Sequence, residues 1–296
     1  MYLSPETVLF IREHRNDDIR SLALQAKKYP QVDMSSAIVQ IAGWQAAASK
    51  IPSLEQCSSE ITALYKASLA QGETLVDLTG GFGIDCAFLA ARFKTVTYIE
   101  RQKELCEIAA HNFPLLGLKQ IRVQNADGVE YLQTMSPTDC IFLDPTRRNE
   151  HGGKTVAISD CEPNAAALEE LLLEKGQQVI IKLSPMLDLS LAIRDMKHVS
   201  EVHIISVNNE CKELLLMLRS EKTSPMILPT LSQPIVCINF ANRKIQRFVF
   251  TREAEQSTDC SYTHKIGTYL YEPNASILKA GAFRNIASAF HLSKLH

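Results

Sequence analysis

Three features are missing from this chain of 296 residues, and each absence excludes a class of protein. No run of about 18 apolar residues occurs, so we predict no transmembrane span. The N-terminus, MYLSPETVLFIREHRNDD, lacks the basic and apolar segments of a secretory signal peptide. The eight cysteines lie 20 or more residues apart without a C-x-x-C pair, which excludes a zinc pattern and a dense disulfide framework. These absences predict a cytoplasmic protein.

The composition that remains is that of an ordinary globular protein, with 46% hydrophobic and 22% charged residues. The net charge of −2 carries no general nucleic-acid signature, but the charge is unevenly distributed. Residues 71–222 carry sixteen basic and twenty-two acidic side chains, whereas residues 223–296 carry eight basic and four acidic ones. A basic terminal module beside an acidic core is the layout expected if a polyanion binds the module. A solvated basic face is the competing interpretation.

The stretch LVDLTGGFGIDCAFLAARFKTVTYIE, residues 75–100, predicts a nucleotide-binding unit. Its first four residues read as a buried strand that ends in the turn Thr79-Gly80-Gly81. From Gly83 a helix is predicted, because apolar residues recur at helical spacing. That predicted face consists of Ile84, Ala87, Phe88 and Ala91. A second strand, residues 96–99, ends at Glu100.

Two cofactors fit this unit at first. Glycines let the backbone approach a ligand closely, and a carboxylate such as Glu100 accepts hydrogen bonds from both hydroxyls of a ribose. NAD and S-adenosyl-L-methionine both carry such a ribose. The dinucleotide fingerprint needs a third glycine where this chain has Cys86, so NAD is disfavoured. The stretch resembles motif I of the class I S-adenosylmethionine-dependent methyltransferases, with Asp77 as the acid and Thr79 in place of the first glycine.

The following chain predicts the rest of an α/β sheet. Strands are expected at residues 121–123, 139–143, 179–183, 202–207 and 213–218. The last two are joined by NNECK, which is too short for a crossover helix, so they should pair as an antiparallel hairpin that closes the sheet. A parallel sheet finished in this way resembles the Rossmann-like fold of class I methyltransferases and disfavours an NAD-dependent dehydrogenase.

The flanking segments predict two further domains, so we expect boundaries at 1–70, 71–222 and 223–296. Residues 5–70 read as helical, with a helix capped by Ser4 and another, capped by Ser58 or Ser59, that bears Ile61, Leu64 and Tyr65. Residues 235–240 and 245–250 predict a hairpin, and residues 276–290 a helix despite Gly281. This terminal α+β module is expected to be incomplete, because its last helix has no following partner.

Candidate functional residues occur at the predicted strand ends. Asp127 suits the adenine amino group, although a turn residue is the alternative. Gln56, Ser58 and Ser59 are candidate cofactor contacts or simple helix caps. Lys182 could bind a phosphate or pair with nearby acids. The candidates for the acceptor pocket, at the sixth strand's edge, are Asn208, Asn209, Glu210, Lys212 and Glu213.

The segment DPTRR, residues 144–148, resembles the D-P-P-x motif of methyltransferases that act on RNA or DNA. The resemblance implies that Asp144 orients or deprotonates the acceptor beside Pro145, while Arg147 and Arg148 hold an anionic edge. Arg147 stands where enzymes that methylate exocyclic amines have an aromatic residue, which disfavours an adenine amino group. The segment at the end of the fifth strand, residues 180–185, contains no cysteine, which disfavours transfer to uridine C5.

Together, EQCSSE, DLTGGFG, DPTRR, IKLSPMLD, NNECKELL and YLYEPNASILKAGAF resemble the bacterial class I methyltransferases with a THUMP-like C-terminal region. The resemblance implies S-adenosyl-L-methionine as cofactor and ribosomal or transfer RNA as partner. The implied cofactor residues are Asp77, Thr79, Gly80, Gly81, Gly83, Glu100, Asp127, Gln56 and Ser58. Two alternatives remain: a non-catalytic RNA-binding protein that has kept the cofactor fold, and an NAD-dependent oxidoreductase.

Overall fold

The computed structural model describes residues 4–14, 28–32, 37, 58–147, 157–219, 232–242 and 244–295. The chain separates into two compact units, Met1–Cys57 and Ser58–His296. In the first unit, helix α1 (Pro5–His14) begins as predicted, because the Ser4 hydroxyl accepts a hydrogen bond from the Thr7 N–H at 3.2 Å. The other helices predicted before residue 58 fall outside the described residues.

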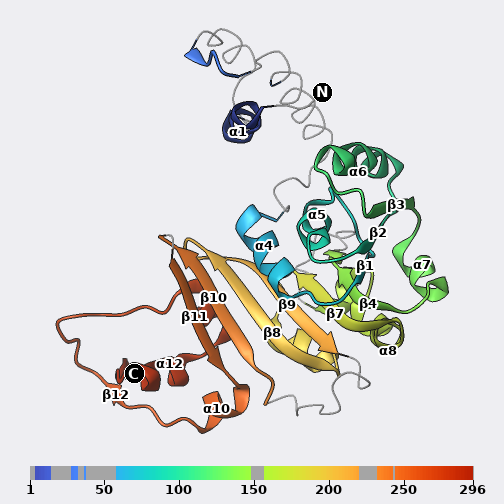
Figure 1. Ribbon diagram of the computed structural model, residues 1–296. Coiled ribbons are helices and arrows are strands. Elements are labelled where there is room, and N and C mark those ends of the chain that lie inside the picture. Colours follow the sequence, from blue (N-terminus) through green and yellow to red (C-terminus); the bar gives the residue numbers. More distant parts are fainter. Residues whose placement is uncertain are drawn as a thin grey trace. The chain divides into compact units, whose positions relative to one another are not determined.

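The second unit is built on one nine-stranded sheet with the order β11-β10-β8-β9-β7-β4-β1-β2-β3 (Figure 1). Strands β1, β2, β3, β4 and β7 run parallel, whereas β9 lies antiparallel between β7 and β8. The class I methyltransferase fold with its antiparallel hairpin is therefore confirmed. The strands are β1 (Thr74–Asp77), β2 (Thr95–Glu100), β3 (Ile121–Asn125), β4 (Thr138–Leu143), β7 (Gly176–Leu183), β8 (Val199–Val207), β9 (Glu210–Arg219), β10 (Ile235–Ala241) and β11 (Lys244–Phe250).

The β8–β9 hairpin does not close the sheet, which corrects one prediction. Strand β10 pairs in parallel with β8, and β11 pairs antiparallel with β10 at the edge. The predicted β10–β11 hairpin thus exists, but it extends the main sheet and is not confined to a separate terminal module. The apolar residues of β10 make this possible, since all seven positions but Ala241 are buried.

Helices cover both faces of the sheet. Side chains from α4, α5 and α6 pack with Leu75, Tyr98 and Phe142 on one face. Side chains from α7, α8, α9 and α11 pack with Val76, Ile99 and other residues on the opposite face. These helices are α4 (Glu60–Leu69), α5 (Ile84–Ala90), α6 (Lys103–Leu115), α7 (Gly128–Thr134), α8 (Ala165–Lys175), α9 (Leu189–Asp195) and α11 (Ala275–Ala280).

Helix α4 was predicted correctly as an element, with Ser59 as its N-cap, but of its three predicted apolar residues only Tyr65 packs on the sheet, against Phe240. Ile61 and Leu64 are exposed, at 38% and 52%. The buried residues are instead Thr62, Ala63, Lys66 and Ala67. Small side chains let α4 approach its neighbours closely, and the buried lysine is stabilised there by carboxylates described below.

The buried face predicted for helix α5 was also partly wrong. It begins after Gly83 as predicted, yet the expected face of Ile84, Ala87 and Phe88 is only partly buried and Ala91 is exposed. The buried residues are Asp85, Cys86, Leu89 and Ala90. The last three pack with Tyr98 and Phe113 beneath the helix, so the contact face is rotated from the predicted one.

The C-terminal helix predicted over residues 276–290 is two helices. Gly281 adopts a left-handed conformation with φ +74° and ends α11, because such a conformation breaks the helical hydrogen-bond pattern. The chain then forms α12 (Phe283–Ala289). The remaining short elements are β5 (Thr146–Arg147), η3 (Ile158–Asp160), β6 (Cys161–Glu162), α10 (Arg252–Ser257), β12 (Tyr262–Thr263) and β13 (Lys294–Leu295). In the described part of the chain, no helix has the length and apolar character needed to cross a membrane.

Candidate active site

The turn after β1 is held by backbone hydrogen bonds to two acids. Oδ1 of Asp77 accepts from the N–H of Thr79 at 3.0 Å. The two carboxylate oxygens of Glu100, at the end of β2, accept from the N–H of Gly81 at 2.9 Å and from the N–H of Gln102 at 2.8 Å. The turn and the second strand end thus form one structure, as the sequence predicted. We call residues 77–83 the glycine turn.

Gly80 is required by a close approach to Tyr98. A Cβ atom at Gly80 would lie 2.2 Å from Cε2 of the Tyr98 ring. The ring cannot move aside easily, because its hydroxyl donates to the carbonyl of Gly81 and its edge packs on Phe113, 5.5 Å away. Tyr98 was not predicted as a site residue. Its position two residues before Glu100, on the same face of β2, was the available signal.

Asp77 is almost fully buried, with 1% of its surface exposed. Burial, helped by the nearby carboxylates Asp85 and Asp144 and opposed by the hydrogen bond from Thr79, raises the pKa of its carboxyl to about 8. At neutral pH this side chain is therefore largely protonated. Its observed contact is with the turn, and its predicted contact with the cofactor stays a prediction.

The other residues predicted to bind the cofactor do not form one group in the structure. Oδ1 of Asp127 caps α7 by accepting from the N–H groups of Val129 and Glu130 at 2.8 and 3.1 Å. Gly83 is buried where α5 begins. Gln56 lies outside the described residues. Ser58 is buried in the cluster described below, so its hydroxyl is already engaged.

Asp144 and Pro145 lie directly after β4, beside the glycine turn. The N–H of Asp144 donates to Oγ1 of Thr79 at 2.6 Å, so Thr79 joins the ends of β1 and β4. This contact explains why threonine can replace the usual first glycine of motif I. Arg147 belongs to β5, which pairs with Cys161 of β6. The Arg147 side chain and the whole of Arg148 lie outside the described residues.

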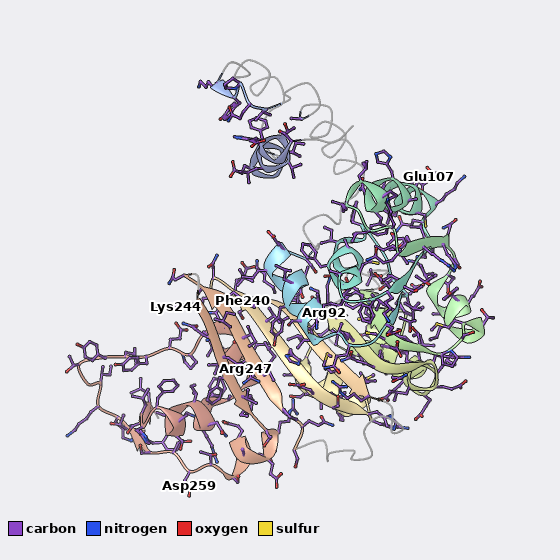
Figure 2. All side chains as sticks on the ribbon, in the orientation of Figure 1. Arg92, Glu107, Phe240, Lys244, Arg247 and Asp259 are labelled. Carbon is purple, nitrogen blue, oxygen red and sulfur yellow. The ribbon has the colours of Figure 1, made fainter. Side chains whose placement is uncertain are left out.

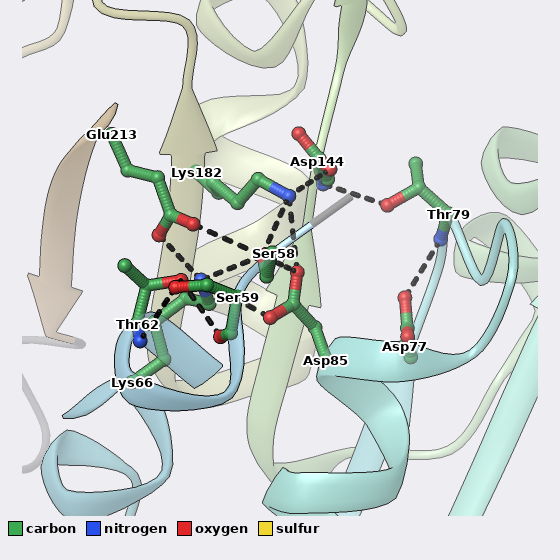
Figure 3. A network of polar contacts seen from close by, with 10 residues as sticks. All are labelled: Ser58, Ser59, Thr62, Lys66, Asp77, Thr79, Asp85, Asp144, Lys182 and Glu213. Carbon is green, nitrogen blue, oxygen red and sulfur yellow. Dashed lines mark hydrogen bonds and ion pairs between the residues drawn. The ribbon is translucent and has the colours of Figure 1, made fainter. Parts of the chain in front are cut away.

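Five charged side chains form a continuous row that is buried except at its last member, Asp144 (Figure 3). In order, the residues are Glu213, Lys66, Asp85, Lys182 and Asp144, and we call this row the charge chain. Lys66 Nζ contacts Oε2 of Glu213 and lies 3.1 Å from Oδ1 of Asp85. Lys182 Nζ lies 3.0 Å from Oδ2 of Asp85 and 2.6 Å from Oδ2 of Asp144. Acids and lysines therefore alternate.

The hydroxyl of Ser58 lies at the centre of the charge chain. It accepts from Lys66 at 2.9 Å and from Lys182 at 3.2 Å. It can donate its one proton to Oδ2 of Asp85 at 2.8 Å or to Oε1 of Glu213 at 3.0 Å. Two lysines, two acids and one serine thereby share a single hydrogen-bonded cluster.

Burial decides which member can meet a substrate. The side chain of Lys66 is 0% exposed, whereas that of Asp144 is 36% exposed. Burial raises the pKa of Asp144, and Lys182 only partly offsets this. Burial also opposes the charge of Lys182, but Asp144 and Asp85 outweigh it and hold the pKa of the ammonium well above its ordinary value. Lys182 is therefore a permanent cation, and Asp144 is the accessible end of the chain.

Two members of the charge chain, Lys66 and Asp85, were not predicted as catalytic or binding residues. Lys66 and Asp85 carried no sequence signal, because a lysine and an aspartate on short helices are normally solvated. Glu213 was considered only as one of several pocket candidates. Within the described residues, no group of three or more His, Cys, Asp or Glu side chains is arranged to hold a metal ion.

A mixed sheet of this order, a glycine turn tied to an acid after β2, and an acid-proline pair after β4 define a class I methyltransferase. Comparison with known proteins agrees with this class. Residues 26–149 match the family model of protein-L-isoaspartate(D-aspartate) O-methyltransferase, and residues 269–296 match a ferredoxin-like domain. A protein-L-isoaspartate O-methyltransferase of Koribacter versatilis is 30% identical over 131 residues, which are 44% of this chain and 53% of that protein. The chain thus spans about half the length of this curated relative.

A more extensive similarity is to a crystal structure from Porphyromonas gingivalis W83, described as a "putative methyltransferase". Its sequence is 33% identical, the similarity covers 100% of this chain and 78% of that one, and the TM-score is 0.76. The chain belongs to the same methyltransferase family as this protein. Its cofactor is S-adenosyl-L-methionine, as the sequence predicted.

Proposed function

We propose that this protein transfers a methyl group from S-adenosyl-L-methionine to a nucleophile that carries a hydrogen atom, on a nucleobase of RNA. The observation that carries the proposal is the position of Asp144. Its Oδ2 is bound by Lys182, and Figure 3 shows the other oxygen pointing away from that lysine. A carboxylate oxygen is a hydrogen-bond acceptor, so it favours an amine, amide or hydroxyl opposite it.

The glycine turn fits the cofactor. Gly80 lies directly against Tyr98, and Glu100 lies beside the turn at the end of β2, where ligands of open α/β sheets bind. When bound, the cofactor supplies a methyl group that its sulfonium already activates. The protein's work is then to align the acceptor, and Asp144 takes the proton that a methylated amine or hydroxyl must lose.

The choice of RNA is supported by surface charge and by exposed aromatic residues. Lys244 and Arg247 are exposed on the edge strand β11 (Figure 2). Tyr269 and Tyr271 are 74% and 65% exposed, with their rings 6.2 Å apart. Exposed cations bind phosphates, and exposed aromatic rings stack on bases. We propose that β11 and the C-terminal segment that carries these two tyrosines dock the RNA.

A second candidate is methylation of the isoaspartyl carboxylate of damaged proteins, which the family model and the Koribacter versatilis relative favour. The family-model match ends at residue 149, however, and so leaves out Lys182 and Glu213. The family model therefore covers the glycine turn more fully than the residues proposed to face the acceptor. An acceptor carboxylate would also face the carboxylate of Asp144, and two like charges at close range repel.

The test is methyl transfer from tritiated S-adenosyl-L-methionine to bulk bacterial RNA and to an isoaspartyl peptide, in parallel. We expect label in RNA and none in the peptide. Asp144→Asn should reduce transfer about 100-fold or more, since general-base catalysis contributes that much. Asp259→Asn, at an exposed acid far along the chain, is the matched control. Label in the peptide alone would establish the second candidate in place of the first.

A further inference from the structure

We infer that Lys66 and Glu213 are positioning residues, which hold the Lys182 ammonium against Asp144 by way of Asp85. Neither residue reaches the exposed end of the charge chain, since their side chains are 0% and 7% exposed. Both act through their neighbours. The inference rests on the proposed function in one respect, namely that Asp144 meets the acceptor.

Hydrogen bonds and ion pairs together hold both lysines in place. An ammonium group has three N–H donors. Lys182 uses them on Oδ2 of Asp144, Oδ2 of Asp85 and Oγ of Ser58. Lys66 donates hydrogen bonds to Oε2 of Glu213 and to the same Oγ, and it forms an ion pair with Oδ1 of Asp85 at 3.1 Å. Each lysine thus has three oxygen partners, which hold it in place.

These contacts favour the second of the two roles predicted for Lys182, pairing with acids, over phosphate binding. A lysine that binds a substrate phosphate needs a free donor, but each of the three on Lys182 already has a partner within the protein. Lys182 therefore orients Asp144 and does not bind the acceptor. The acceptor meets a carboxylate whose one oxygen is held and whose other oxygen is open, which selects a neutral group with an N–H or O–H.

The arrangement of the charge chain also argues against a purely stabilising role for its buried residues. Burying charges is expensive, and well-packed apolar residues of similar volume often stabilise a protein equally well or better. Here five secondary structure segments, α4, α5, β9, β7 and the end of β4, each contribute one charge to a row that leads to the accessible acid. Asp85 is the link, because its two oxygens bind different lysines.

The test removes the remote pair as a unit. In Lys66→Met/Glu213→Leu, Asp85 loses one of its two lysines and draws Lys182 away from Asp144. The first expected result is a fall of at least tenfold in kcat, with less than a threefold change in the KM for S-adenosyl-L-methionine. The second is a rise of about one unit in the pKa of Asp144, which a carbon-13 NMR titration measures. The single variant Lys66→Arg keeps the positive charge, so its kcat and its Asp144 pKa should stay close to those of the parent protein.

The matched control is Lys94→Met/Glu73→Leu, which removes an exposed pair in the same unit. An Asp144 titration that is the same in the double variant, the control and the parent protein would overturn the inference. The titration needs no substrate, so it decides the inference even where the search for an RNA acceptor fails. Ser58→Ala is the milder variant if the double variant does not fold, and it should shift the titration in the same direction by less.

Discussion

The glycine turn and the charge chain lie side by side but are held together by opposite means. In the turn, main-chain N–H groups bind Asp77 and Glu100, and the absence of a side chain at Gly80 makes room for Tyr98. In the charge chain, side chains bind one another, and the main chain takes no part in the ion pairs. Any added atom should therefore damage the turn, whereas any lost charge should damage the chain.

The largest effect is expected from Lys66→Met, which keeps the length of the side chain and removes its charge. Asp85 and Glu213 would then remain buried with fewer partners. Removing one partner of a buried ion pair costs about 3–5 kcal/mol of unfolding free energy. Urea denaturation measures it, and Lys66→Met/Glu213→Leu should recover part of the loss. A loss below about 1 kcal/mol, typical of an exposed pair, would mean that the lysine is not buried as described.

A smaller loss is expected from Gly80→Ala. The new methyl group would lie 2.2 Å from the anchored Tyr98 ring, so either the ring or the turn must shift. Overpacking of this kind costs about 1–3 kcal/mol. Binding of S-adenosylhomocysteine should weaken as well, measured by calorimetry.

Gly267→Ala is the control for this substitution, since a Cβ there would meet nothing within 4 Å. It should change stability by no more than about 0.5 kcal/mol. If both variants bind and unfold alike, the close approach to Tyr98 does not constrain the turn.

The same contrast explains what the sequence could predict. The turn was predictable because its acid, glycines and helix start lie within a few residues of one another, so their spacing carries the geometry. The charge chain was not, because its members come from residues 66, 85, 144, 182 and 213, which only the folded sheet brings together. Of these, Asp144 and Lys182 were found through their positions at strand ends.

The errors in helix faces have the same origin. The prediction for α4 chose three large apolar residues, of which Tyr65 packs on the sheet, whereas Ile61 and Leu64 are exposed and Lys66 is buried. Hydrophobic periodicity assumes that charge faces water, and that assumption fails where carboxylates are also buried. The sheet extension by β10 escaped prediction for a simpler reason: strand pairing across residues 208–234 is not local.

A third prediction uses the pKa of Asp77, which burial raises from 3.8 to about 8. Between these values the folded protein keeps a proton that the unfolded chain releases, so stability should fall as pH rises towards 8. The slope is at most about 1.4 kcal/mol per pH unit. Asp77→Asn cannot ionise and should lack this slope, so its stability relative to the parent protein rises with pH. Thermal unfolding at several pH values measures it, and parallel curves would contradict it.

The smallest effect is expected where the two regions meet, at Thr79. Its N–H donates to Asp77 in the turn, and its hydroxyl accepts from the N–H of Asp144 in the charge chain. Thr79→Val keeps the shape and the first bond but removes the acceptor, at a cost of about 1 kcal/mol. Thr79→Ser keeps both bonds and should cost less.

The informative measurement is a double-mutant cycle of Thr79→Val with Lys182→Met, read by urea denaturation. A coupling energy above about 0.5 kcal/mol means that the turn and the charge chain fix Asp144 jointly, because independent sites add within that margin. Strict additivity would mean that the cofactor turn and the acceptor acid are positioned separately, and that Thr79 merely satisfies one backbone N–H.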